Sequence, residues 1–344
     1  MLRARSVDLQ SRRVCMVAVE GIQIHRIAAD GDLDGLLSAA ILKRFWNDVE
    51  VRFSHPAEIR RGDLDDFIDA QTAVVDLPFH PNCGLHIDHH LTNKPTESQL
   101  SEVEERGGKI IWEAALSAAR VCFDTFKQIV DLSDIEPWME MVDKLDGGKI
   151  TREEFLSNHP IVWIGRVMDA SDFELCSVLL EKISGGASPE EVLNIDSVFE
   201  KVCVAKAEFA RLQSMIDTCS EVVDRMAIVR LDGKGVRTNG YLITAYFGEQ
   251  CDACIIIHGD DQPQEHQWPL SASFYTNSFL HKNGGLFDLT TLATAFDLDG
   301  GGHANACGCR IQPLSKTGRL ENREVKLSDV ERNLDAWMHA WSAR

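Results

Sequence analysis

Acidic residues and histidines that could bind metal ions stand at three places near the start of the chain, each directly after a short aliphatic segment. They are, in chain order, ADGDLDG with Asp30, Asp32 and Asp34, VVDLP with Asp76, and LHIDHH with Asp88, His89 and His90. Three carboxylates within five residues repel one another unless a cation lies among them. The dipole of a following helix favours one or two acids there, but it explains a third less well.

The segments that carry these residues alternate between strand-like and helix-like patterns. We expect strands at 22–29, 49–54, 72–78 and 85–90, and helices at 35–46 and 113–130. Such alternation predicts an α/β fold with a parallel sheet, whose ligands bind at the carboxyl ends of the strands. The acids and histidines should therefore meet at one edge. Mixed Asp/His sets suit Mn²⁺ or Mg²⁺ better than a structural zinc, and a pair of such ions suits hydrolysis of a phosphate ester.

The rest of the chain predicts a second domain. At 344 residues the chain exceeds one typical hydrophobic core. Residues from 131 to about 225 have helical patterns, after which strands are expected at 226–231, 241–247, 253–259 and 270–275, followed by a helix at 286–296. We therefore predict a flexible leader at 1–21, a catalytic domain at 22–195, a helical connector at 196–222 and a smaller α/β domain at 223–344.

The overall charge restricts the class of partner. With 54 acidic and 35 basic residues the formal net charge is −19, which argues against a general electrostatic grip on long nucleic acid. No apolar run approaches the ~18 residues that a membrane-spanning helix needs. Ten cysteines without the spacing of a disulfide framework fit a reducing compartment, so we expect a cytoplasmic protein without a membrane partner.

Two segments resemble calcium-binding EF-hand loops in part. The segment DGDLDGLLSAAI places Asp and Gly correctly but has Ile41 where the bidentate Glu belongs. The segment DKLDGGKITREE has Leu145 and Gly147 at two ligand positions. Each lacks ligands where calcium needs them, so calcium is a weak alternative.

Cysteines offer a second alternative, a four-thiolate zinc site. The residues concerned are Cys251 with Cys254, and Cys307 with Cys309. The spacing of the second pair is poor for zinc, and small thiols are common core residues, so this alternative is also weak.

Taken together and in this order, DGDLDG, VVDLP, IDHH and the distal GGGHANACG resemble the DHH superfamily of phosphoesterases that carry a C-terminal DHH-associated domain. The resemblance covers roughly residues 22 to 312, and it is looser in the helical middle. It implies two Mn²⁺ ions in the N-terminal domain, with Mg²⁺ or Co²⁺ as substitutes. It also implies these roles: Asp30 and Asp32 each contact one ion, Asp76 bridges both, His89 is a ligand, Asp88 supports the cluster, and His90 faces the scissile phosphate.

The resemblance implies one further metal-binding Asp beyond the histidines. Asp143 in MEMVDKLDGG has the expected separation, with Asp146 as the alternative and Asp169 further away. Many relatives also have a His two or four residues before the first metal-binding Asp, where this chain has Ala28 and Arg26. The first ion is therefore expected to have fewer protein ligands.

In the second domain the resemblance implies a phosphate-binding loop. Its backbone amides can approach a phosphate closely because three successive residues lack a Cβ, namely Gly300, Gly301 and Gly302. His303 is expected to donate a hydrogen bond to the phosphate at the start of a helix. Relatives often have an Arg on the preceding strand, which is absent from SASFYTNSF. Arg237 or Lys282 would then have to meet the phosphate charge.

The resemblance and the acidic surface together predict a Mn²⁺-dependent phosphodiesterase that hydrolyses short 5′-phosphorylated oligonucleotides, especially linear dinucleotides such as pGpG or pApA. The alternatives within the superfamily are polyphosphate or pyrophosphate hydrolysis, removal of the 3′-phosphate from adenosine bisphosphate, and RecJ-like exonuclease action on single strands. An alternative of another class is a non-catalytic calcium- or nucleotide-binding protein. Whether the chain forms a homodimer stays open.

Overall fold

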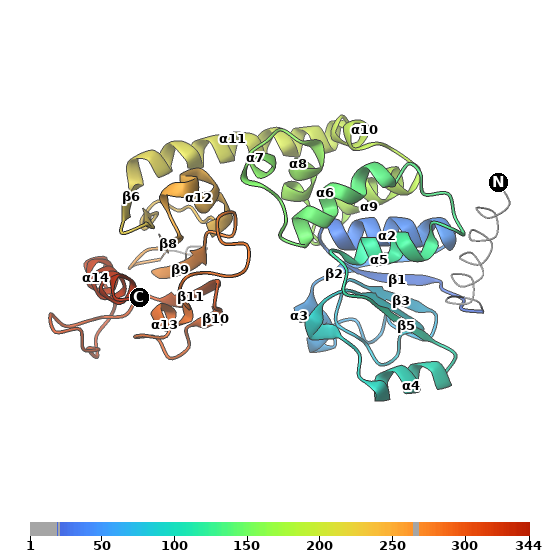
Figure 1. Cartoon of the computed structure of the whole chain (residues 1–344), viewed down its shortest axis with the longest axis horizontal. Helices are drawn as coiled ribbons and strands as arrows, with labels where there is room; N and C mark the ends of the chain where they lie inside the picture. The colour runs from blue at the N-terminus through green and yellow to red at the C-terminus, as the bar shows by residue number, and fades with distance from the viewer. Residues whose placement is uncertain (1–18, 20, 264–267) are drawn as a thin grey trace. The chain divides into compact units, whose positions relative to one another are not determined.

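The structure is a computed structural model that describes residue 19 and residues 21–263 and 268–344. The leader expected at 1–21 falls almost wholly outside the described residues. The chain divides into two compact units, one of Met1–Ile150 with Ser157–Lys206 and one of Thr151–Leu156 with Ala207–Arg344 (Figure 1). The division falls within the long helix α11 (Asp196–Cys219). In the described part of the chain no helix combines the length and the apolar character needed to cross a membrane.

The first unit is built on a five-stranded sheet in which every neighbouring pair of strands is parallel. The strand order is β2 (Glu50–Ser54), β1 (Arg26–Asp30), β3 (Thr72–Val75), β4 (Leu85–Asp88) and β5 (Lys109–Trp112). The middle strands β3 and β4 are buried along their whole length, as aliphatic segments covered on both faces should be. The α/β class expected from the sequence is confirmed.

Helices cover both faces of this sheet. Helix α2 (Leu33–Phe45) packs on β1 and lies between α5 (Ala118–Phe126) and α9 (Phe173–Ser184), so that Leu33 to Leu42 are all buried. On the other face, Ile59 of α3 (Pro56–Arg61) packs against Ala28 and Val74 of the sheet. The remaining helical segments of this unit are η1 (Leu91–Asn93), α4 (Glu97–Glu105), α6 (Glu136–Asp146), α8 (Pro160–Val167) and α10 (Pro189–Leu193).

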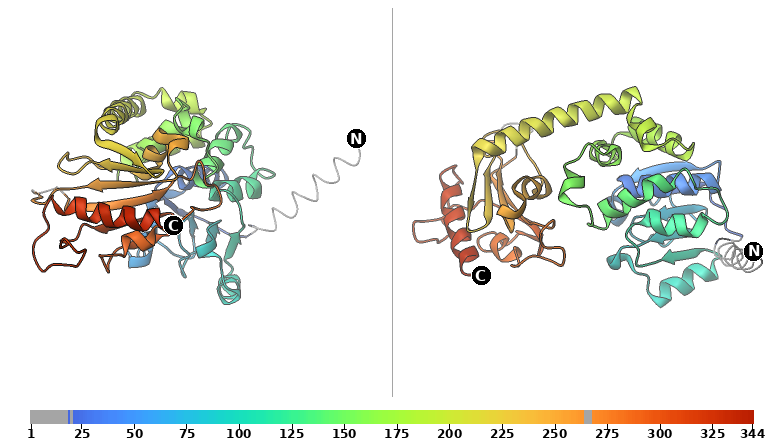
Figure 2. Two further views of the ribbon diagram at one scale, coloured as in Figure 1. Left: turned by 60° about the vertical axis from the view of Figure 1, so that its left-hand side comes forward. Right: turned by 45° about the horizontal axis from the view of Figure 1, so that its top comes forward.

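The second unit contains a six-stranded mixed sheet with helices on both faces (Figure 2). The strand order is β10 (Gly301–His303), β11 (Ala306–Arg310), β9 (Ser271–Thr276), β8 (Ala253–His258), β7 (Met226–Arg230) and β6 (Ser220–Val223), with β7 and β8 parallel and the other pairs antiparallel. The helical segments are α7 (Arg152–Phe155), α12 (Gly240–Phe247), η2 (Gly248–Gln250), α13 (Thr290–Ala293) and α14 (Asp329–Ser342).

Several expectations about local structure were wrong. The helix expected at 286–296 is limited to Thr290–Ala293. Residues 241–247, expected as a strand, form α12, because Asn239 caps the helix by accepting a hydrogen bond from the Leu242 amide at 3.3 Å. Close packing also fixes the helix on the sheet, since a Cβ at Gly240 would lie 2.1 Å from the Tyr275 ring. The helix expected at 113–130 is only Ala118–Phe126, because Ser117 supplies its N-cap.

One glycine sets the distance between α2 and β1. A Cβ built on Gly35 would lie 2.2 Å from the Asp30 carbonyl oxygen, which no real side chain permits. The last glycine of DGDLDG therefore allows the first turn of α2 to lie directly on the end of β1. This close packing places the acids of that segment at the carboxyl edge of the sheet.

We predict that Gly35→Ala lowers the free energy of unfolding by about 1–3 kcal/mol, the usual cost of forcing an extra methyl group into a packed site. Urea denaturation measures this change. The matched control is Gly165→Ala, also inside a helix, whose new Cβ would meet Leu33 at an ordinary 3.5 Å. The control should be neutral or more stable by up to ~1 kcal/mol, because alanine favours helix. Equal stability of the two variants would contradict this account of Gly35.

Candidate metal centre

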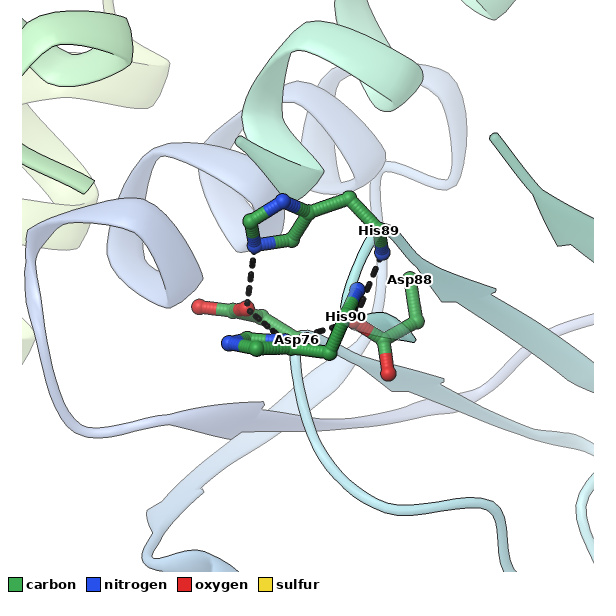
Figure 3. A group of neighbouring side chains, drawn as sticks. All are labelled: Asp76, Asp88, His89 and His90. Atoms are coloured by element: carbon green, nitrogen blue, oxygen red, sulfur yellow. Dashed lines mark hydrogen bonds and ion pairs between the residues drawn. The ribbon is translucent and has the colours of Figure 1, made fainter. Parts of the chain in front are cut away.

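The carboxyl edge of the first sheet gathers the acids and histidines that the sequence singles out. Three groups of side chains have ligand atoms within 4.8 Å of one another. They are Asp30 with Asp32 and Asp76, Asp34 with His89 and Asp146, and Asp76 with Asp88, His89 and His90. Figure 3 shows the last group, with the His89 and His90 rings turned toward Asp76 from successive positions after β4. The groups share Asp76 and His89, so they form one cluster.

The three acids of DGDLDG have different partners. Asp30 accepts a hydrogen bond from the Gly31 amide at 2.6 Å. Burial raises the Asp30 pKa to about 6, and the charge of Asp32 contributes to this rise. Asp32 caps α2 by accepting from the amides of Asp34 and Gly35, each at 3.0 Å. The site therefore has the positive end of the α2 dipole at its border.

Asp34 is a structural acid that the sequence analysis did not assign a role. It is almost fully buried, and its two oxygens accept from the Ala118 and Ala119 amides, each at 2.7 Å. Asp34 thus caps the N-terminus of α5 from a helix that lies far away in sequence. Burial, then repulsion from Asp146 and Asp32, raises its pKa well above the usual value. Only the tertiary structure could reveal this contact.

Asp76 has an unusual backbone conformation. Its φ of 57° lies in the left-handed region, which few residues other than glycine adopt. The Asp76 amide donates to the Ile87 carbonyl at 3.0 Å, and the buried His86 donates through Nε2 to the Leu77 carbonyl at 2.9 Å. His86, which the sequence analysis passed over, therefore holds the backbone directly after Asp76. Burial, followed by the charges of Asp34 and Asp32, raises the Asp76 pKa well above its usual value.

Asp88 organises the residues that follow β4. One oxygen accepts from the His89 amide at 2.7 Å and the His90 Nδ1 at 2.9 Å, and the other accepts from the Asn93 side chain at 2.6 Å. Burial opposes ionisation, but the bonds from His90 outweigh it and lower the Asp88 pKa. In return, the bond to Asp88 raises the His90 pKa. The His90 ring is 43% exposed, so its Nε2 remains for a ligand.

His89 presents its Nε2 atom to the acids. Its Nδ1 donates to the Ala115 carbonyl at 3.3 Å, which fixes the ring orientation. The Nε2 lies 3.0 Å from Asp146 Oδ2, 3.7 Å from Asp34 Oδ2 and 3.8 Å from Asp76 Oδ1. Among the described residues, His89 Nε2, Asp76 Oδ1 and Asp146 Oδ2 are buried without a well-aligned hydrogen bond, and His89 Nε2 and Asp146 Oδ2 meet as an ion pair when the ring is protonated. Buried polar atoms are normally satisfied, and a divalent cation would satisfy these three.

The two acids proposed for the last ligand have separate environments. Asp143 accepts from the Ser117 hydroxyl at 2.7 Å and from Arg120 Nε at 3.0 Å, which ties α6 to the start of α5. Asp146, nearly one turn later on α6, reaches His89. The structure therefore brings the alternative, Asp146, to the cluster and engages Asp143 elsewhere.

Asp169 belongs to a loop that packs close to the first motif. A Cβ on Gly31 would lie 2.1 Å from the Ala170 side chain, so this loop borders the end of β1. The Asp169 carboxylate accepts from the Ser171 amide at 2.8 Å and its hydroxyl at 2.7 Å. It belongs to none of the ligand groups found among the described residues.

In the second unit the glycine-rich loop is a β-hairpin and not the start of a helix. Gly301 and Gly302 have φ of 157° and 139°, and β10 pairs with β11, which places His303 opposite Ala306. A Cβ on Gly300 would lie 2.4 Å from the Ala293 carbonyl oxygen, so packing alone requires a glycine there. His303 is exposed.

Arg237 also lies in the second unit, and it is exposed. Its guanidinium lies over the Trp268 ring, 5.2 Å from the centroid. Burial, and then the charge of Arg237, lowers the pKa of His258 to about 4. Arg237 is therefore a cation available to a ligand at this surface.

The cysteines do not form the zinc site that was weighed. Cys251 and Cys254 belong to one hydrophobic core of the second unit, whereas Cys307 belongs to the other and Cys309 packs against it. The two pairs thus lie on opposite sides of the sheet. No ligand group among the described residues includes a cysteine.

Comparisons with known proteins bear on the fold. No protein-family model matches the chain, and no curated protein sequence matches it. The pGpG-specific phosphodiesterase PggH from Vibrio cholerae is similar in structure, with a TM-score of 0.73 and 23% identity over 93% of this chain and 99% of that one. RecJ from Thermus thermophilus, in complex with Mn²⁺, gives a TM-score of 0.52 and 13% identity over 97% of this chain and 54% of RecJ. The chain therefore has the fold of the DHH phosphoesterases, as its four motifs predict.

Proposed function

We propose that the chain is a metal-dependent phosphodiesterase that hydrolyses short 5′-phosphorylated oligonucleotides, above all linear dinucleotides such as pGpG or pApA. The observation that carries this proposal is the convergence of two acids on His89: Asp76 Oδ1 and Asp146 Oδ2 both lie close to His89 Nε2, and all three atoms are buried without a well-aligned hydrogen bond. Two divalent ions in this cluster, Mn²⁺ by preference and Mg²⁺ or Co²⁺ as substitutes, would supply positive charge to the phosphoryl group and to the attacking water.

The position of each residue in the cluster supports the ligand roles that the family resemblance implies. Asp30 and Asp32 would each contact one ion, and Asp76 would contact both, because it belongs to the groups on either side. His89 and Asp146 would complete the second group. Asp146 would take the place expected of Asp143, since the Asp143 carboxylate is occupied by Ser117 and Arg120.

His90 would act on the substrate directly. Asp88 would act indirectly, by orienting the His90 ring. Because His90 donates through Nδ1 to Asp88, its Nε2 is the atom that can donate to a phosphate or leaving-group oxygen. The raised pKa of His90 favours the protonated ring that this role needs. Asp88 itself is fully buried and holds the ring in place.

Three considerations support a short oligonucleotide substrate. The structurally similar PggH is described as pGpG-specific, which motivates a dinucleotide for this chain. The formal charge of −19 disfavours a long single strand, which needs a cationic track. Within the second unit, the Gly300–His303 loop and Arg237 carry backbone amides, an imidazole and a guanidinium, groups that can bind a phosphate.

We place this activity in the cytoplasm. None of the cysteines that the structure describes is in a disulfide, and most are buried, as suits a reducing compartment.

The first prediction concerns the assignment of the last ligand. Asp146→Asn should reduce bound Mn²⁺, measured by elemental analysis after gel filtration, and lower kcat/KM at least a hundred-fold while the fold persists. Asp143→Asn should retain the metal but lower the free energy of unfolding by about 2 kcal/mol, because Arg120 loses its partner. The reverse pattern, metal loss in Asp143→Asn alone, would restore Asp143 as the ligand.

The second prediction concerns Asp76, whose backbone conformation calls for a careful substitution. Asparagine tolerates the left-handed region, so Asp76→Asn removes the charge without straining the turn. The rate of hydrolysis should fall more than ten-fold, which corresponds to an activation barrier higher by more than ~1.4 kcal/mol.

The same substitution that lowers the rate of hydrolysis should raise the stability of the metal-free protein. A carboxyl whose folded pKa is raised destabilises the fold as pH rises through that pKa, so near neutral pH in EDTA the Asp76→Asn variant should unfold at a higher temperature than the wild type. Thermal unfolding in EDTA and in Mn²⁺ measures both states. An active Asp76→Asn enzyme would exclude the bridging role.

The third prediction concerns substrate length. With Mn²⁺, kcat/KM should be highest for 5′-phosphorylated dinucleotides and fall with each added nucleotide, because a longer strand adds phosphates that meet an acidic surface. Chromatography of products from di- to hexanucleotides, a twenty-mer, polyphosphate and adenosine bisphosphate measures this profile. A flat or rising profile would point to RecJ-like exonuclease action, and preference for polyphosphate would overturn the nucleotide assignment.

A further inference from the structure

A tryptophan lies beside the proposed catalytic residues without a role in the metal cluster. Trp112 is the last residue of β5, and its Cα is the register partner of Asp88 on β4. Its indole Nε1 donates to the His90 carbonyl at 2.9 Å. One hydrogen bond therefore fixes the ring directly next to the segment that carries His89 and His90.

The Trp112 ring has a cationic neighbour, in contrast to the acidic cluster, and two exposed leucines lie next in sequence to the residues of the histidine segment and its contacts. The Lys94 ammonium lies 5.1 Å from the Trp112 ring centroid, and the Lys94 side chain is exposed. Leu91 follows His90 in the sequence and is 79% exposed. Leu116 follows Ala115, whose carbonyl accepts from His89, and is 42% exposed. Both leucines are exposed and therefore contribute little to the core of the first unit.

This combination suits one class of ligand. A site that binds only phosphate groups gains nothing from an indole ring, because phosphates bind cations and hydrogen-bond donors. Nucleobases, in contrast, stack on aromatic rings whatever their sequence. A lysine beside such a ring can bind the phosphate next to the stacked base.

We propose that Trp112 and Lys94 form a nucleobase-binding subsite that selects nucleotide substrates over polyphosphate, an inference that rests on the proposed function. A base stacks on the indole in exchange for the Lys94 ammonium, and Lys94 then binds an adjacent phosphate. The exchange is favourable because stacking of a base on an aromatic ring outweighs a cation–π contact at an exposed site. The hydrogen bond to the His90 carbonyl keeps the subsite in register with the catalytic histidine.

The test compares two substrates on the Mn²⁺-loaded enzyme: pGpG and the same sugar–phosphate chain without bases. The measured quantity is the ratio of their kcat/KM values. Trp112→Ala should lower this ratio roughly ten- to a hundred-fold, which corresponds to about 1.4–2.8 kcal/mol. Trp112→Phe, which keeps a ring but loses the indole N–H, should keep the ratio within about three-fold of wild type.

Trp46 provides a matched control in the same unit. It is also partly buried, but it lies at the opposite end of α2 from Asp32, where it packs on Phe45 and Phe126. Trp46→Ala should leave the ratio unchanged. If Trp112→Ala slowed both substrates equally, or if Trp112→Phe lowered the ratio as much as Trp112→Ala, the indole would merely position His90 and the subsite would be disproved.

A binding measurement separates failure of this inference from failure of the proposed function. In the Asp76→Asn protein, pGpG should quench tryptophan fluorescence, and the additional substitution Trp112→Phe should remove most of the quenching. Quenching through Trp112 in a protein whose wild type hydrolyses no nucleotide would retain the subsite and reject the phosphodiesterase activity. Hydrolysis of pGpG without any contribution of Trp112 to the quenching would reject the subsite and retain the activity.

Discussion

Repulsion among clustered carboxylates is the constraint on which the structure of the first unit depends. Asp30, Asp32, Asp34, Asp76 and Asp146 gather at one edge of the sheet, where burial disfavours the charged forms of Asp30, Asp34 and Asp76. The fold offsets part of this cost with backbone amides: the first turns of α2 and α5 donate to Asp32 and Asp34. Both helices therefore direct their positive ends toward the site. Among these five carboxylates, the buried oxygens without a well-aligned hydrogen bond are Asp76 Oδ1 and Asp146 Oδ2, and both are assigned here to metal ions.

Around this cluster, a second set of contacts determines where each ligand points. Asp88 receives hydrogen bonds from the backbone and side chain of His90, and Ala115 orients His89. His86 holds the carbonyl that follows Asp76. Such supporting residues govern ligand orientation as much as the ligands do. The contacts join β3, β4 and the start of α5, so the geometry of the site depends on the register of the whole sheet.

The gathering of the strand-end residues could be predicted from the sequence because it depends on local patterns. Asp30, Asp76 and Asp88 each follow an aliphatic strand, and parallel strands bring their ends together. The sequence could not distinguish Asp143 from Asp146, because both belong to one helix and the choice depends on Arg120 and Ser117, more than twenty residues away. Tertiary contacts similarly overrode local pattern in 241–247, where an apolar run without clear periodicity became a helix, and after His303, where a hairpin formed instead of a helix.

The left-handed backbone at Asp76 also restricts how this protein can diverge. Residues that adopt such a conformation at low cost are glycine, asparagine and aspartate, and of these only aspartate carries a charge. A glutamate, with a longer reach and the same charge, would have to strain the turn or reshape it. An enzyme that keeps this turn can place aspartate or the neutral asparagine here, so a longer acidic ligand has to come from another position. The backbone conformation of a single residue thus limits which metal ligands this position can supply.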